Sequence, residues 1–139
     1  MCIRDRCIRD QKFKTDILSS AILDFNGVHS TFICSTQSNV SQQVMVLGTK
    51  KTLVIENPFN AVAKKSTFVV IYNGKSIYRK DNKIKEFLPS DQYENQVKTF
   101  SNHILKKNKI DFGLGDAKNN MKVIDAMFKS IKEKKWINV

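Results

Sequence analysis

The apolar residues follow two different patterns along the chain. Up to about residue 78, short segments rich in β-branched and aromatic residues alternate apolar and polar positions, which is typical of strands. These segments are residues 17–25, 29–37, 44–49, 52–56, 68–72 and 76–78. Three turns separate them in pairs, at Asn26-Gly27, at Gly48-Thr49-Lys50-Lys51 and at Asn73-Gly74. Since Asn and Gly tolerate the positive φ of tight turns, the order predicts three successive hairpins.

The later part of the chain has helical spacing. Asp91 and Glu94 have the form of a capping box, and they predict a helix from about residue 91 to 106. Its apolar stripe is Tyr93, Val97, Phe100 and Ile104. A second stripe, Ala117, Met121, Ile124, Phe128 and Ile131, predicts another helix that begins near Asp116. We expect Trp136 and Ile137 to close the chain against the core.

Strands followed by helices indicate an α+β fold. We expect one large, mostly antiparallel open sheet with the helices packed on one face. Within the predicted strand 29–37, Phe32 and Cys34 share one face and Ile33 lies on the other. Neither face is purely polar, so we expect both to be covered, and Cys34 to be a small buried apolar residue rather than a nucleophile. Phe32, Ile33 and Cys34 are therefore candidate contacts of a homo-oligomer that forms through the sheet face.

The first ten residues, MCIRDRCIRD, differ from the remainder in composition. They repeat a unit of five residues and hold Arg4, Arg6 and Arg9, whereas the remaining chain is rich in lysine and has Arg79 as its single arginine. A period of five matches neither a helix nor a strand, so we expect no core element here. The stretch also resembles translated sequencing-adapter text. We therefore expect residues 1–10 to be a non-native leader and residues 11–139 to be the domain.

Composition and charge exclude several classes of function. The net charge is +11, but the lysines are scattered over predicted loops and helix ends, which argues against a nucleic-acid partner. No apolar run approaches the roughly 20 residues of a membrane span, and the charged N-terminus is unlike a signal peptide. Three cysteines cannot form a closed disulfide set, which favours a cytoplasmic protein. Cys2 and Cys7 lack a second Cys or His pair at metal-site spacing, so we expect no metal.

Short motifs give no catalytic constellation. Asp111-Phe112-Gly113 copies a kinase tripeptide without the other kinase motifs. Gly113-Leu114-Gly115 is similar to part of a dinucleotide loop, but Lys118 occupies the third glycine position, so a helix-entry turn explains it better. His29 and His103 have no nucleophile or carboxylate at catalytic spacing. The residues themselves therefore indicate no enzyme active site.

In order and spacing, five segments resemble the C-terminal domain of the Gfo/Idh/MocA family of NAD(P)-dependent oxidoreductases. They are SSAILDF (19–25), STFICSTQ (30–37), VLGTKKTLVIENPFN (46–60), DQYENQVKTFSNHIL (91–105) and NNMKVIDAMFKSIKEKKWINV (119–139). Together they cover nearly the whole chain from about Thr15. One departure is Lys51, where the family usually has the second glycine of a Gly-Thr-x-Gly turn with positive φ.

The resemblance implies a two-domain enzyme that binds NAD or NADP in an N-terminal Rossmann domain. Such enzymes transfer a hydride to or from sugars, inositols and related polyols, and their C-terminal domain forms a wall of the substrate site and often an oligomer interface. The family's dinucleotide loop, Glu-Lys-Pro segment and Asp-x-x-x-His segment would all precede Thr15. We therefore expect this chain to lack catalytic and cofactor-binding residues and to bind no cofactor alone. Gln37 and Tyr93 are the positions expected at the substrate wall.

Two other functions fit the pattern. The chain could be a free-standing, non-catalytic interaction module, which an upstream stop codon would favour. It could also be a basic nucleic-acid-binding domain, whose affinity would fall steeply with salt.

Overall fold

The computed structural model describes residues 1–74, 82–106 and 112–139, and these form two compact units. Unit 1 comprises residues 1–39 and 111–139, and unit 2 comprises residues 40–110. The elements of unit 1 are β1 (Cys2–Arg9), β2 (Asp16–Asp24), β3 (His29–Ser35), α2 (Leu114–Glu133) and β8 (Ile137–Asn138). Those of unit 2 are β4 (Gln43–Leu47), β5 (Lys51–Glu56), β6 (Thr67–Asn73), β7 (Asn82–Phe87) and α1 (Gln92–Lys106). The α+β class is confirmed, but the described strands form two four-stranded sheets where a single sheet was expected.

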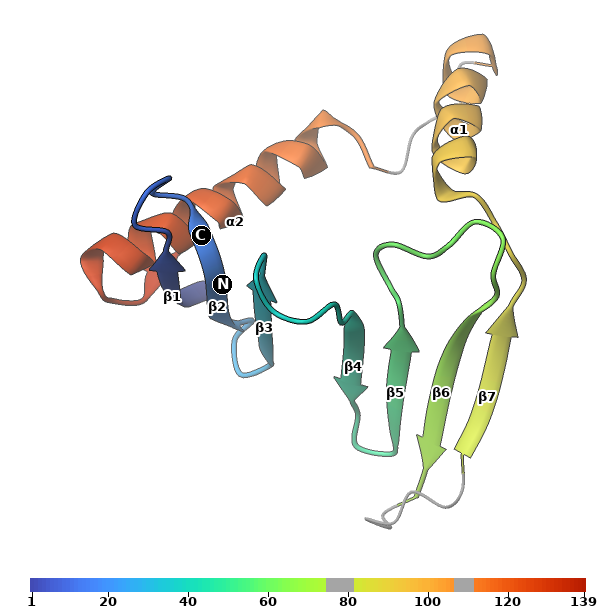
Figure 1. Ribbon diagram of the computed structural model, residues 1–139, viewed down its shortest axis with the longest axis horizontal. Helices are drawn as coiled ribbons and strands as arrows, with labels where there is room; N and C mark the ends of the chain where they lie inside the picture. Colours follow the sequence, from blue (N-terminus) through green and yellow to red (C-terminus); the bar gives the residue numbers. More distant parts are fainter. Residues whose placement is uncertain (75–81, 107–111) are drawn as a thin grey trace. The chain divides into compact units, whose positions relative to one another are not determined.

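The sheet of unit 1 has the strand order β3-β2-β1-β8, with antiparallel neighbours, and α2 packs against it (Figure 1). Its core consists of Ile3, Leu23, Ala126 and Ile137, of which Ile3 is fully buried. Ile3 lies opposite Leu23 on one side and opposite Ile137 on the other. The expectation that residues 1–10 contain no core element is therefore wrong. A strand in mid-sheet is held largely by backbone hydrogen bonds to its neighbours. These bonds do not depend on the period at which side chains repeat.

Ser130 of α2 joins the edge of β1 to the turn that follows the helix. β8 pairs only with Cys2 and Ile3, so the edge of β1 lies open beyond that point. There the Ser130 hydroxyl accepts a hydrogen bond from the Asp5 N–H at 3.1 Å and donates one to the Lys135 carbonyl at 2.8 Å. Ser130 is fully buried, and its bond with the Asp5 N–H is shielded from water, whereas its bond with the Lys135 carbonyl is partly buried. The Ser130 hydroxyl thus links β1, α2 and the turn that precedes β8.

The first predicted hairpin is confirmed in detail. Asn26 and Gly27 both have positive φ, 61° and 94°, as the turn requires. The Phe25 N–H donates to the Val28 carbonyl at 2.8 Å, and the Asp24 carboxylate accepts from the Gly27 N–H at 2.7 Å. The turn is therefore fixed by its own residues, which explains why it could be read from the sequence.

The sheet of unit 2 has the order β4-β5-β6-β7, and all its neighbours are antiparallel. The predicted hairpin of β4 and β5 is confirmed. Lys51 does not have the positive φ of the family's glycine; it is the first residue of β5. Its carbonyl accepts a hydrogen bond from the Gly48 N–H. The predicted strand 76–78 lies outside the described residues. β6 pairs with β5 on one side and with β7 on the other. The apolar pattern did not predict β7, because exposed lysines, Lys83 and Lys85, interrupt the apolar residues of that strand. Lysines on an edge strand discourage pairing with further strands.

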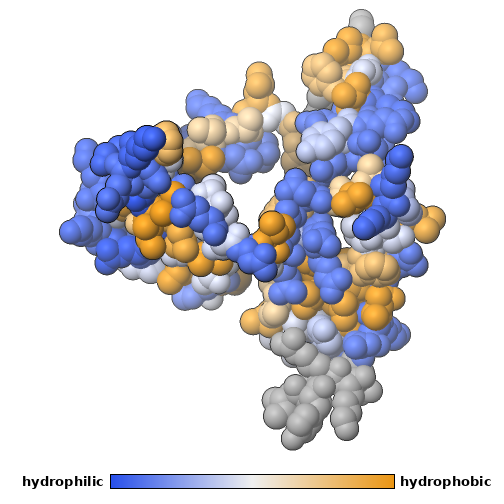
Figure 2. All heavy atoms as spheres, in the orientation of Figure 1, coloured by the Kyte–Doolittle hydropathy of each residue, from blue (hydrophilic) through white to orange (hydrophobic). Residues whose placement is uncertain are grey.

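Helix α1 begins as predicted. The Asp91 carboxylate accepts hydrogen bonds from the N–H groups of Tyr93 and Glu94, at 2.9 and 3.0 Å, and so caps the helix. However, α1 buries none of its residues, and Figure 2 shows apolar side chains on its surface. The expectation of helices packed on one sheet face is confirmed for α2 and is wrong for α1. At the C-terminus, Ile137 is buried as expected, whereas Trp136 is half exposed.

Asp5 is a charged residue in the apolar core of unit 1. Its side chain is 2% exposed, and it lies in register with Ala21 of β2. Burial raises the pKa of this carboxyl, the hydrogen bond from the Arg6 N–H opposes that effect, and the nearby Asp16 carboxylate adds to it. A raised pKa means that the folded state binds the proton more tightly than the unfolded state does. The stability contributed by this group is therefore present at low pH and is lost as the pH rises through the folded-state pKa.

We predict that Ser130→Ala lowers the free energy of unfolding by about 1–3 kcal/mol, because it leaves the buried Asp5 N–H and Lys135 carbonyl without their partner. Urea denaturation followed by circular dichroism measures the change. Ser101→Ala, at an exposed position of α1, is the matched control and should change stability little. An equal effect of the two substitutions would contradict the bridging role of Ser130.

We predict that Asp5→Asn raises the free energy of unfolding at neutral pH by about 1 kcal/mol, because the amide keeps an acceptor for the Arg6 N–H and removes a buried charge. The advantage over the parent chain should shrink as the pH falls toward 3.8, where the unfolded-state carboxyl also takes up its proton. Denaturation at several pH values tests this, with Asp125→Asn, at an exposed position of α2, as control. A pH-independent difference would refute the electrostatic explanation.

Candidate functional site

Gln37 follows β3 in a turn that Ser35 organises. The Ser35 hydroxyl donates to the Ile17 carbonyl at 2.9 Å and accepts from the N–H groups of Gln37 and Ser38, both at 3.2 Å. The Thr36 N–H also donates to the Ile17 carbonyl. Such hydroxyl-to-backbone bonds end a strand in a defined turn. The backbone at Gln37 is thus fixed by its neighbours.

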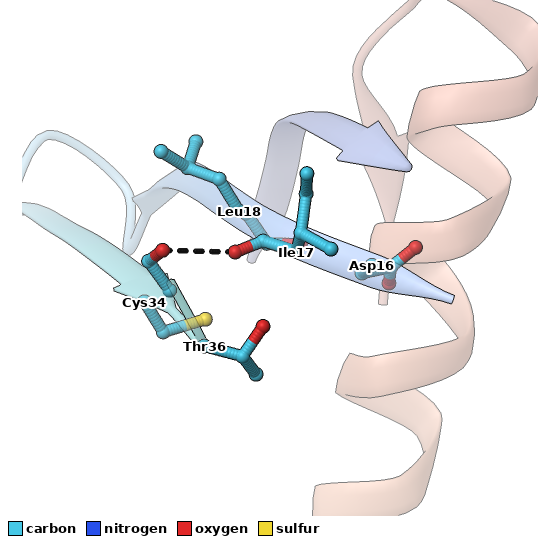
Figure 3. A pocket seen from close by; sticks show the side chains of 7 residues that line it. Asp16, Ile17, Leu18, Cys34 and Thr36 are labelled. Carbon is cyan, nitrogen blue, oxygen red and sulfur yellow. Dashed lines mark hydrogen bonds between the residues drawn. The ribbon is translucent and has the colours of Figure 1, made fainter. Parts of the chain in front are cut away.

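Beside this turn lies a small hollow between the ends of β2 and β3. Its volume is about 130 Å³, and Figure 3 shows its lining, which is Asp16, Ile17, Leu18, Ser19, Cys34, Ser35 and Thr36. Asp16 is already paired with Arg9 at 3.3 Å. Hydroxyl, thiol and carboxylate groups can form hydrogen bonds to a hydroxylated ligand, but none of them is arranged as a nucleophile with a base. The hollow therefore offers groups that could bind or orient a hydroxylated ligand.

Tyr93, the second candidate for the substrate wall, lies in unit 2 at the start of α1. Its side chain is largely exposed, and its backbone N–H belongs to the helix cap. Gln37 and Tyr93 therefore belong to different units, and each is positioned by its own local turn or cap.

The three candidate oligomer residues lie on β3 as the alternation required. Phe32 pairs with Ala21 and Cys34 with Ser19, on the face that carries the core, whereas Ile33 pairs with Ser20 on the opposite face. Phe32 is 37% exposed and Ile33 is 70% exposed. Cys34 is also exposed, so the expectation of a buried cysteine is wrong. Because β3 ends the sheet, α2 does not cover it as it covers β1.

The glycine pair near residue 114 is a helix entry, as expected. Gly113 is the N-cap of α2, and its carbonyl accepts from the N–H groups of Asp116 and Ala117. A Cβ added at Gly113 or Gly115 would meet no protein atom within 4 Å, so neither glycine is required by close packing against another part of the described chain. Asp111, the first residue of the kinase-like tripeptide, lies outside the described residues.

The two histidines lie in different units, His29 in unit 1 and His103 in unit 2. His29 pairs with Asp24 across the β2–β3 hairpin, with 3.6 Å between Nε2 and Oδ1. His103 lies in the last turn of α1. Over the described residues, no group of three or more His, Cys, Asp or Glu could hold a metal ion. Over the same residues, neither helix has the length and apolar character needed to cross a membrane.

The structure also reveals a basic hollow that the sequence argument missed. Arg4 and Arg6 of β1 line it together with Ser20, Ile22 and Thr31, and its volume is about 240 Å³. The spacing of two residues between the arginines was the available signal, since it places both on one face of a strand. The expectation that residues 1–10 lie outside the fold excluded this hollow.

Comparison with known proteins gives one match in sequence and several in structure. The chain is 30% identical over 131 residues to the uncharacterized oxidoreductase ORF334 of Rhizobium meliloti. This match covers 94% of the chain and 39% of the relative, so the chain spans about two fifths of the relative's length. No family model matches the sequence.

Solved oxidoreductases share the fold at low identity. KijD10, a 3-ketoreductase from Actinomadura kijaniata in complex with TDP-benzene and NADP, superimposes with a TM-score of 0.82 at 12% identity, covering 94% of this chain and 39% of KijD10. The oxidoreductase yvaA from Bacillus subtilis superimposes with a TM-score of 0.74 at 11% identity, covering 99% of this chain and 45% of yvaA. In sequence, the chain thus matches about two fifths of an oxidoreductase, and in fold it matches parts of two solved oxidoreductases.

Proposed function

We propose that this chain is the C-terminal substrate and oligomerisation domain of a cytoplasmic, NAD(P)-dependent oxidoreductase. The whole enzyme would transfer a hydride to or from a sugar, an inositol or a related polyol. The observation that carries the proposal is the sequence match to an oxidoreductase over 131 residues of this chain. The shared fold with a 3-ketoreductase that was solved with TDP-benzene and NADP supports it.

The domain's part in the reaction is to shape the substrate site rather than to carry the chemistry. Its described residues offer hydrogen-bonding groups at the ends of β2 and β3, around Gln37, and an exposed aromatic side chain at Tyr93. The nicotinamide and the groups that move the proton would then belong to a Rossmann domain, and the domain described here would show no activity by itself.

The expectation that residues 1–10 are a non-native leader concerns β1, which these residues form. We infer that residues 1–10 occupy a strand position that a different sequence fills in the whole enzyme. The buried carboxylate of Asp5 supports this, because a charge at a core position is a conflict between the residue and its surroundings. Backbone pairing tolerates such a replacement, since it uses no side chain.

We expect the 139-residue chain to bind no NADP, because the proposal assigns the cofactor to a Rossmann domain. Isothermal titration with NADP and NAD measures this, and KijD10, which was solved with NADP, is the positive control. Micromolar binding by this chain would overturn the assignment of the cofactor to another domain. Loss of binding in the control would show a faulty assay, which is then repeated.

We expect sequencing of the source locus across the codons for residues 1–15 to replace the decapeptide with a frame that continues into a Rossmann domain. In the enzyme encoded by that frame, Gln37→Ala and Tyr93→Phe should raise KM about tenfold and leave kcat nearly unchanged, because wall residues contribute binding rather than chemistry. Asn120→Ala, at an exposed position of α2, is the control. A genomic decapeptide preceded by a stop codon would refute the oxidoreductase proposal.

A further inference from the structure

The turn between β2 and β3 contains the two groups of a self-modification reaction. When glycine follows asparagine, its backbone nitrogen can attack the side-chain amide of the asparagine, because glycine has no side chain to hinder the approach. Asn26 and Gly27 are both exposed, and a Cβ added at Gly27 would meet no protein atom within 4 Å. Packing alone therefore does not prevent this reaction in the described chain.

The reaction balances with water as its only co-reactant. The Gly27 nitrogen loses its proton and bonds to Cγ of Asn26, and the bond between Cγ and the Asn26 amide nitrogen breaks. That nitrogen leaves as ammonia, with the proton that Gly27 gave up, and a succinimide ring remains. Water then opens the ring to aspartate, or to isoaspartate, whose backbone passes through the side-chain carbon. The first step needs a deprotonated backbone nitrogen, because the lone pair of an amide that keeps its proton is delocalised over the carbonyl.

The Asp24 carboxylate opposes this deprotonation in two ways. Its Oδ1 accepts a hydrogen bond from the Gly27 N–H at 2.7 Å, a short, charge-assisted bond that must break before the proton leaves. Its negative charge also opposes the formation of a second negative charge on the adjacent nitrogen. The Nε2 atom of His29 lies 3.6 Å from the same Oδ1. The proton that the reaction removes is therefore the one that Asp24 holds.

We propose that Asn26 is a site of succinimide formation that the Asp24 carboxylate keeps unreactive while the hairpin is folded. The succinimide has no proton on the Gly27 nitrogen, so the reaction and the bond from Gly27 to Asp24 exclude each other. Isoaspartate would also lengthen the turn by a backbone carbon and place a second carboxylate near Asp24. Protection of Asn26 therefore preserves the hairpin that carries the Ser35 turn and Gln37. The inference needs no assumption about the oxidoreductase activity.

Peptide mass spectrometry after prolonged incubation of the whole chain tests the inference. We expect Asp24→Asn to raise the deamidation rate at Asn26 about tenfold, because the amide oxygen still accepts the Gly27 N–H and only the charge is lost. His29→Gln removes the ion pair of the same hairpin and leaves the carboxylate in place, so it should not raise the rate. Asn73-Gly74, in unit 2, is the internal reference and should react at the same rate in the parent and both variants. An unchanged rate with Asp24→Asn, or an equal rise with His29→Gln, would overturn the proposal.

Incubation in urea gives a second test, because it removes the folded turn and keeps the sequence. In urea, the parent chain and the Asp24→Asn variant should deamidate at Asn26 at nearly the same rate, since the carboxylate no longer holds the Gly27 N–H. The parent chain should also react about tenfold faster when unfolded than when folded. A parent chain that reacts equally fast in both states, or a difference between the two chains that persists in urea, would show that the folded hydrogen bond does not set the rate. The proposal would then be wrong.

Discussion

The contact between the first strand and the last helix is the interaction on which unit 1 depends. Ile3 packs in one cluster with Ala126 and Ile137, and the Ser130 hydroxyl ties the edge of β1 to the turn before β8. The Val139 N–H also donates to the Met1 carbonyl, so both ends of the chain meet (Figure 1). A helix that packs on a central strand through small residues can approach the backbone closely, and here a single buried hydroxyl satisfies the polar groups at that approach.

The same arrangement fixes the hairpin that carries Gln37 at its end. The pairing of β1 positions the β2–β3 hairpin, and the Ser35 turn at its end sets the backbone at Gln37. The hairpin thus presents hydrogen-bonding groups beside the small hollow between the ends of β2 and β3.

Asp5 and the exposed stripe of α1 are two places where local sequence and surroundings disagree. A carboxylate occupies a core position of β1, and the stripe of α1, Tyr93, Val97, Phe100 and Ile104, is more than half exposed along the helix. In both cases the residue type suits a different environment from the one that the structure gives it.

By itself, the sequence determined the features that depend on neighbouring residues. The hairpin turn at Asn26-Gly27, the cap at Asp91 and the helix entry at Gly113 were predictable because their stabilising bonds lie within a few residues of one another. The tertiary structure alone decided that residues 1–10 form a central strand, that Cys34 is exposed and that β7 pairs with β6. These outcomes depend on pairing and packing between segments far apart in the sequence, which no local pattern of apolar residues records.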